Sequence, residues 1–225
     1  MKLSRNILYS PFILITVLFA ACAAHSNLEP VGKGSFDLSL SVGGPVVSAF
    51  GTKVPIPYAT AGTNYGLTDR WNINGNFHLL PFAFQVAGID LGATWFPVLN
   101  RGAVPTVGIQ PGLLIFSSFK SGVDQRFRAY PMMSGSLAWQ VGQGLFYTGF
   151  DSVLPLSSPD YDDESPSVIF SPFLGYHWRL GSRTYLLTEL KWQAANVENG
   201  ELAIQYMGIG DRGAVTPLVS IVRNF

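Results

Sequence analysis

After its first two dozen residues, the chain alternates apolar and polar residues with a period of two, and this pattern constrains the fold more than any other feature. In residues 71 to 79, Trp71, Ile73 and Phe77 fall on one face of an extended strand, while three asparagines and His78 fall on the other. No run of 18 or more apolar residues occurs in the same part of the chain, which excludes a membrane helix there. The sequence therefore predicts an all-β protein.

Ten strands can be placed between punctuating glycine, proline, asparagine and aspartate residues. We expect them near residues 35–43, 55–67, 71–79, 84–97, 103–117, 128–141, 145–155, 167–180, 183–195 and 214–225. The connections alternate in length, with tight turns at 68–70, 98–102, 142–144 and 181–182 and mostly longer loops between them. Short turns at one end and long loops at the other are typical of barrels in the bacterial outer membrane. The pattern predicts an antiparallel transmembrane β-barrel of about ten strands, with eight or twelve as alternatives.

The composition agrees with a surface that faces an apolar medium. Only 12% of the residues are charged, while 13% are aromatic and 24 are glycine; a typical soluble domain has about 25% charged residues. The 14 basic and 14 acidic residues cancel, so the chain has no net field to attract nucleic acid. The single cysteine excludes an internal disulfide and a thiolate metal site, and no phosphate, zinc or dinucleotide motif occurs. We therefore expect neither a metal nor a cofactor.

The tryptophans favour a membrane barrel over a soluble sandwich, which would also alternate apolar and polar residues. Trp71, Trp95, Trp139 and Trp178 each lie within a few residues of a tight turn, on the apolar face of their strand. An aromatic girdle of this kind marks the membrane interface in outer-membrane barrels. A soluble core would scatter its tryptophans along the strands.

The N-terminal segment has the organisation of an export signal: two basic residues, an apolar stretch and a group of small residues. Its end, Phe19-Ala20-Ala21-Cys22, resembles the lipobox of bacterial lipoproteins, which implies that Cys22 becomes the acylated first residue of the mature protein. The alternative is ordinary cleavage near Ala23 or Ala24, with Cys22 discarded. The chain then divides into an export signal at 1–21, a short tether at 22–34 and a barrel domain at 35–225.

Two further stretches resemble parts of outer-membrane barrel proteins. The last strand ends at Phe225, and a terminal phenylalanine on an alternating strand resembles the signal by which such proteins reach their insertion machinery. Residues 65 to 73 resemble the strand, tight turn and strand unit of these proteins, with Thr68-Asp69-Arg70 as the periplasmic turn. The resemblance identifies a class rather than a named family. It implies the insertion machinery, outer-membrane lipid and lipopolysaccharide as partners.

Several charged residues fall on the polar face of their strands and would point into the barrel. Buried charges pair with one another, so we expect an interior network of mixed sign. Its predicted members are Asp90, Asp151, His177, Arg179, Glu189 and Lys191.

The sequence favours a barrel without enzymatic activity, with a structural or adhesive role or a role in limited solute passage. One alternative is a hydrolase, either a protease or a lipid-modifying enzyme, that is active at the outer rim. In that case the weak catalytic candidates are His78, at the exterior end of the strand 71–79, and Asp162 and Asp163, in the acidic loop after the strand 145–155. An acid and a base on one rim would suit a protease that resembles the omptins, although their paired dyads are not recognisable here. A further alternative is a periplasm-facing lipoprotein with a soluble β-barrel or sandwich.

Overall fold

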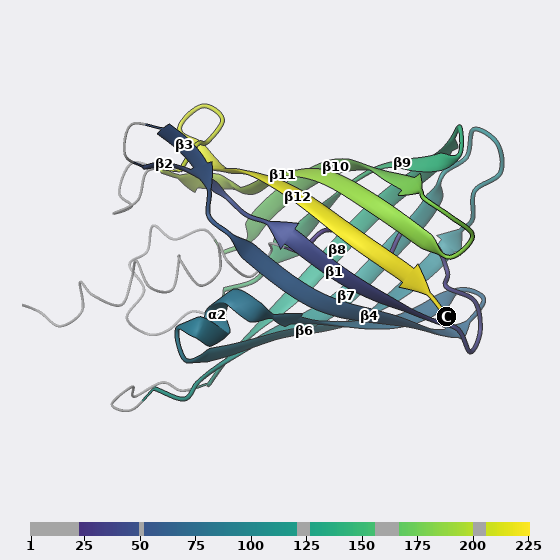
Figure 1. The fold of residues 1–225 in the computed structure, drawn as a ribbon, viewed down its shortest axis with the longest axis horizontal. Coiled ribbons are helices and arrows are strands. Elements are labelled where there is room, and N and C mark those ends of the chain that lie inside the picture. The colour runs from purple at the N-terminus through teal and green to yellow at the C-terminus, as the bar shows by residue number, and fades with distance from the viewer. Residues whose placement is uncertain (1–22, 50–51, 121–126, 156–166, 200–205) are drawn as a thin grey trace, which may run out of the picture.

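The computed structural model describes residues 23–49, 52–120, 127–155, 167–199 and 206–225. Ten antiparallel strands form a closed barrel in which the last strand pairs with the first (Figure 1). The barrel strands are β1 (Phe36–Gly43), β4 (Tyr58–Thr68), β5 (Trp71–His78), β6 (Val86–Val98), β7 (Thr106–Ser118), β8 (Phe127–Val141), β9 (Gly144–Val153), β10 (Ile169–Arg179), β11 (Thr184–Glu198) and β12 (Arg212–Asn224). The predicted fold class and number of strands are confirmed.

Two short elements that the sequence did not predict lie at the end of the barrel opposite the C-terminus (Figure 1). The strands β2 (Val46–Ala49) and β3 (Thr52–Pro55) form a separate hairpin, so the predicted strand 55–67 begins three residues late, at Tyr58. The helix α2 (Leu79–Ala83) connects β5 to β6. Among the described residues, no helix is long and apolar enough to cross a membrane.

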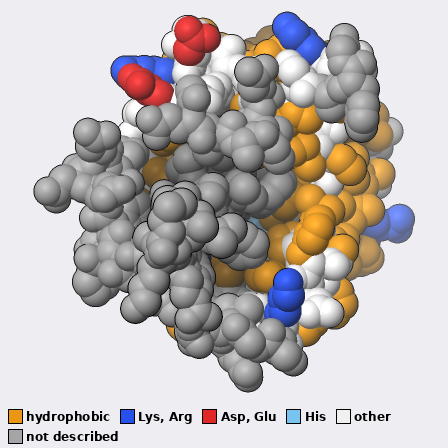
Figure 2. Space-filling view, turned by 90° about the vertical axis from the view of Figure 1, so that its left-hand side faces the viewer, with side chains coloured by type: hydrophobic (Ala, Val, Ile, Leu, Met, Phe, Trp, Pro, Cys, Tyr) orange, Lys and Arg blue, Asp and Glu red, His pale blue; other side chains and the backbone are white. Residues whose placement is uncertain are grey.

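The alternation of residues places apolar side chains outside and polar side chains inside. On β1 the side chains of Leu38, Leu40 and Val42 are 47%, 48% and 51% exposed on the outer surface. On the inner surface, Asn72 and Thr94 are 0% exposed. Viewed from the long-loop end, the visible described surface is largely hydrophobic and shows only scattered charged side chains (Figure 2). In a soluble protein the apolar side chains are inside and the polar ones outside. The opposite arrangement here fits a barrel that is surrounded by lipid.

Aromatic side chains gather on the outer surface at the tight-turn end. Trp71 and Trp95 are direct partners across β5 and β6, and their rings stack at 6.1 Å. The ring of Trp139 lies 6.1 Å from that of Phe146, on the neighbouring strand. On β10, the ring of Trp178 lies 4.3 Å from that of Tyr176. Each of the four tryptophans therefore lies close to another aromatic ring near a tight turn.

Five prolines lie inside barrel strands, where each lacks the N–H that a ladder hydrogen bond requires. Pro131, Pro172 and Pro217 each lie one residue beyond the end of the pairing with one neighbouring strand. Pro97 and Pro111 fall in gaps of the pairing between β6 and β7. The prolines therefore occupy positions where the ladder on one side is already interrupted, and the barrel closes around them.

Candidate functional site in the barrel lumen

The residues that precede β1 lie inside the barrel. We call residues 23–31 the plug segment. Its backbone is held by the wall: the N–H of His25 donates to Glu189 Oε2 at 2.8 Å, and the ammonium of Lys191 donates to the carbonyl of Ala23 at 3.0 Å. Leu28 is only 2% exposed. The segment that the sequence presented as a short tether therefore passes through the lumen, as far as it is described.

Asparagine side chains hold the middle of the plug segment. Asn27 donates from Nδ2 to the hydroxyl of Thr94 on β6, and it accepts a hydrogen bond of 2.7 Å from Asn72 on β5. The Asn72 amide also donates to the carbonyl of Glu29 at 3.2 Å and accepts from the N–H of Val31 at 3.3 Å. A single wall residue thus binds the plug segment at three points. The period of two on β5 is what directs this side chain inward.

Three charged wall residues form what we call the lumen cluster: Asp151 on β9, and Glu189 and Lys191 on β11. The Lys191 ammonium lies 2.7 Å from Asp151 Oδ2 and 3.4 Å from Glu189 Oε1, and all three residues are buried. Tyr147 donates to Glu189 at 3.1 Å, and Ser134 donates to Asp151 at 2.6 Å. Strand alternation explains the arrangement, since Glu189 and Lys191 are two residues apart on one face.

A second group lies apart from the lumen cluster and contains the predicted rim candidate His78. The hydroxyl of Tyr58 lies 2.6 Å from His78 Nδ1, and His78 Nε2 lies 3.2 Å from Asp90 Oδ2. Asn76 donates to the other Asp90 oxygen at 2.7 Å. The side chain of His78 has no exposed surface. Its position inside the wall, in contact with the ring of Phe116, gives a substrate at the rim no access to its nitrogens.

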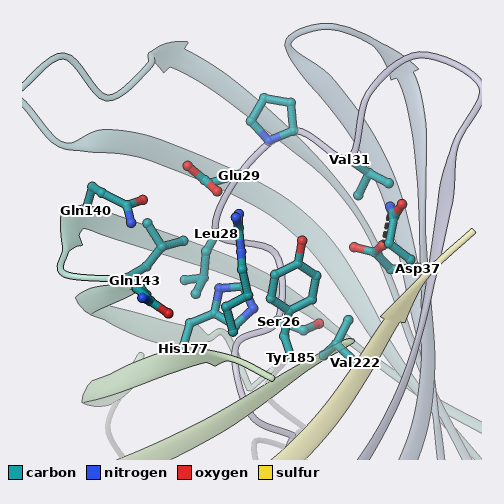
Figure 3. A pocket seen from close by; sticks show the side chains of 15 residues that line it. Ser26, Leu28, Glu29, Val31, Asp37, Gln140, Gln143, His177, Tyr185 and Val222 are labelled. Carbon is teal, nitrogen blue, oxygen red and sulfur yellow. Dashed lines mark hydrogen bonds between the residues drawn. The ribbon is translucent and has the colours of Figure 1, made fainter. Parts of the chain in front are cut away.

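The remaining predicted charges, His177 and Arg179, line a cavity of about 220 Å³ at the tight-turn end. We call this cavity the vestibule (Figure 3). Part of its lining comes from the plug segment, including Leu28 and Glu29, and the rest comes from the wall. Asn224 donates to Asp37 at 2.8 Å on one side. The structure thus places the six predicted charges in three groups, and Asp90 shares one cavity with Asp151 and Lys191 of the lumen cluster.

Cys22, Asp162 and Asp163 lie outside the described residues. Sequence reasoning missed the roles of His25 and Asn27, because it treated their segment as a tether. The available signal was the number of glycines on inward positions, which leaves space that the wall does not fill.

The described lumen offers hydrogen-bonding groups and one compact set of charges. Within the described residues, no group of three or more His, Cys, Asp or Glu side chains is arranged to hold a metal ion. The wall groups instead bind the backbone and amide of the plug segment. The site therefore holds a polypeptide segment in a polar lumen through hydrogen bonds.

No protein-family model and no curated protein matches the chain. Among solved structures, it is similar to an outer-membrane channel from Pseudomonas putida F1, at 12% identity and a TM-score of 0.48 over 90% of this chain and 100% of that chain. It is also similar to the translocator domain of the autotransporter NalP from Neisseria meningitidis, at 10% identity and a TM-score of 0.45 over 98% and 97%. The outer-membrane protease OmpT from Escherichia coli gives 8% identity and a TM-score of 0.38 over 85% and 92%. These low values carry no role over to this chain.

Proposed function

We propose that this protein is a bacterial outer-membrane β-barrel without enzymatic activity, in which the plug segment controls the passage of small polar solutes. Its closed ten-strand wall and apolar outer surface support the membrane location. The tight turns and the C-terminus then face the periplasm, and the long loops face outward. Lipid and lipopolysaccharide contact the outer surface. The C-terminal strand, which ends at Phe225, is the contact for the insertion machinery.

One observation carries the proposal of solute passage: polar groups of the wall are satisfied by a segment that is not part of the wall. Asn72 and Thr94 both bond to Asn27 of the plug segment, so removal of that segment exposes a lining of hydrogen-bonding groups. A barrel with only a structural role can fill its interior with side chains from its own strands. Here a channel with a polar lining is closed by a separate strand of polypeptide.

The wall also makes room for residues 32–35, which join the plug segment to β1. Gly66 on β4 points inward, and a Cβ at this position would lie 1.9 Å from the carbonyl oxygen of Gly32. Its N–H donates to Ser35 at 3.0 Å, and its carbonyl accepts from Gly34 at 2.9 Å. Glycine is therefore required where the chain turns from the lumen into β1. The wall therefore fits the backbone of residues 32–35, which join the plug segment to β1.

A reversible cross-link tests the proposal. In a Cys22→Ser background, Asn27→Cys and Thr94→Cys place two thiols where the native side chains are in hydrogen-bond contact. The same substitutions remove those hydrogen bonds, so the plug segment is held less tightly when the thiols are reduced. We expect ion conductance across a planar bilayer in the reduced state and its loss after oxidation.

The control pair lies in the wall alone. Ser41 and Ser220 face each other across β1 and β12, with hydroxyl oxygens 2.9 Å apart. Ser41→Cys and Ser220→Cys in the same background should give a conductance that oxidation does not change. If the Asn27–Thr94 pair forms its disulfide but conductance is absent in both redox states, the solute-passage role is wrong and a structural or adhesive role remains.

The buried position of His78 weighs against the alternative of a rim-active hydrolase. His78 has no exposed surface, its Nδ1 lies 2.6 Å from the Tyr58 hydroxyl and its Nε2 lies 3.2 Å from Asp90 Oδ2. The apolar outer surface weighs against a soluble periplasmic domain, because large side chains such as Leu174, which is 51% exposed, would then face water.

A further inference from the structure

The direction of the plug segment restricts how the chain reaches this state. Val31 binds Asn72, which lies two residues after the tight turn that precedes β5. Ala23 lies deeper, beside Lys191 and in a cavity that Asp90 and Val153 also line. The N-terminal end of the segment therefore points away from the tight turns.

This direction conflicts with an attached export leader. Under the proposed orientation, the tight turns face the periplasm, and a leader held in the inner membrane lies on that same side. Residues preceding Ala23 would have to enter the lumen from the periplasm and continue toward the outer end. A free N-terminus can be drawn into the lumen in this way, whereas a chain still anchored behind it cannot.

The charges around the end of the plug segment point to the same conclusion. In the lumen cluster, two carboxylates, Asp151 and Glu189, face one ammonium group, that of Lys191. The ring of His25 stacks on Phe173 at 5.0 Å, and its Nε2 has no hydrogen-bond partner, so it is not placed as the second cation. The backbone nitrogen of His25, in contrast, lies 2.8 Å from Glu189 Oε2. A positive charge on the backbone at this point would balance the cluster.

We propose that an envelope peptidase cleaves the chain after Ala23 or after Ala24, and that the α-ammonium group of the mature N-terminus is the second cation of the lumen cluster. Hydrolysis adds one water across the peptide bond, which leaves a carboxylate on the released leader and an α-ammonium on the mature chain. Both bonds follow small residues, as signal cleavage requires. The new charge then pairs with Glu189 in the lumen and holds the plug segment in place.

The same geometry separates this route from acylation of Cys22. An acylated Cys22 would lie three residues before His25, whose backbone nitrogen lies 2.8 Å from Glu189 inside the barrel. Acyl chains belong in the lipid and would keep residues 23 to 28 out of a polar lumen. Docking of the plug segment and a lipid anchor at Cys22 therefore exclude each other.

The first measurement is the mass of the mature protein. The full chain is expressed in a Gram-negative host, extracted from outer membranes in detergent and analysed intact, and its N-terminal peptide is sequenced by mass spectrometry. We expect a chain that begins at Ala24 or His25 and carries no acyl group. A mature chain that begins at Cys22, with or without acyl groups, or that retains its leader, overturns the proposal.

The second measurement is the reactivity of the α-amine toward an acylating reagent, read from the N-terminal peptide. We expect labelling of the folded barrel to be slower than that of the urea-unfolded chain by on the order of tenfold or more, because the amine is buried. Glu189→Gln removes its partner and should raise labelling of the folded protein. Glu198→Gln is the matched control, since Glu198 pairs with Arg212 on the exposed surface and should leave labelling unchanged.

The comparison of folded and unfolded wild-type protein stands even if Glu189→Gln fails to fold. Equal labelling rates in the two states would show that the N-terminus is outside the lumen and would overturn the proposal. The outcome is distinguishable from that of the conductance experiment, because a docked N-terminus is compatible with a barrel that never conducts.

Discussion

Replacement of Lys191 by methionine tests whether the lumen cluster is as shielded from solvent as its burial indicates. Lys191 is 1% exposed and lies 2.7 Å from one carboxylate and 3.4 Å from another. At an effective dielectric constant of about 20, each attraction at ~4 Å is worth about 4 kcal/mol. The cost of desolvating the ammonium offsets part of this attraction. Removing one partner of a buried pair generally costs about 3 to 5 kcal/mol, because the remaining charge is left without compensation. We expect a loss of this size for Lys191→Met.

The assay is the free energy of unfolding in lipid vesicles across a urea series, from tryptophan fluorescence and heat-modifiable gel migration. Arg212→Met is the matched control: Arg212 lies 3.0 Å from Glu198, but the two side chains are 52% and 77% exposed. An exposed pair contributes about 0 to 1 kcal/mol. Lys191→Met combined with Asp151→Asn should recover part of the lost stability. If Lys191→Met costs no more than Arg212→Met, the lumen cluster is hydrated and the reasoning from burial is wrong.

Three other predictions use the same unfolding assay. Leu174→Arg should lower the free energy of unfolding by about 2 to 4 kcal/mol if this outward position lies near the bilayer midplane. Val141→Arg, beside a tight turn, should lower it by only about 0 to 1 kcal/mol. Equal and negligible losses for the two variants would contradict a lipid-facing surface. Gly175→Ser should cost about 1 to 3 kcal/mol by overpacking, since a Cβ there would lie 2.5 Å from the Tyr147 ring, and a neutral result would show that Tyr147 can move aside. Tyr58→Phe removes one buried hydrogen bond and should cost about 0.5 to 3 kcal/mol; a gain in stability would show that the bond is not formed.

The strands and their faces could be predicted from the sequence because β-strand alternation is a local property. A period of two assigns every second residue to the same side, whatever the rest of the chain does. The inward direction of Asn72 and the outward direction of Trp71 follow from their positions in one strand. The closed ten-strand barrel follows from the number of such strands and from the alternation of tight turns with long loops.

The sequence predicted the secondary structure less well where apolar and polar residues do not alternate. Residues 79 to 83 contain only one turn of helix, and no helical period can be recognised over five residues. The hairpin of β2 and β3 has strands of four residues each. Its pattern merges with that of the following strand. The end of β11 continues to Glu198 through an irregularity in its pairing with β12, which alternation does not reveal.

The contacts inside the lumen could be determined only from the tertiary structure. The sequence places Asp90, Asp151 and Lys191 on inward faces, but the distances around the barrel determine that Asp151 pairs with Lys191 while Asp90 pairs with His78. The plug segment shows the same limit more strongly, because residues 23 to 31 have the composition of a tether. They lie in the lumen because the closed wall leaves a polar space there. Asn27 meets hydrogen-bonding partners 45 and 67 residues away in the chain, Asn72 and Thr94.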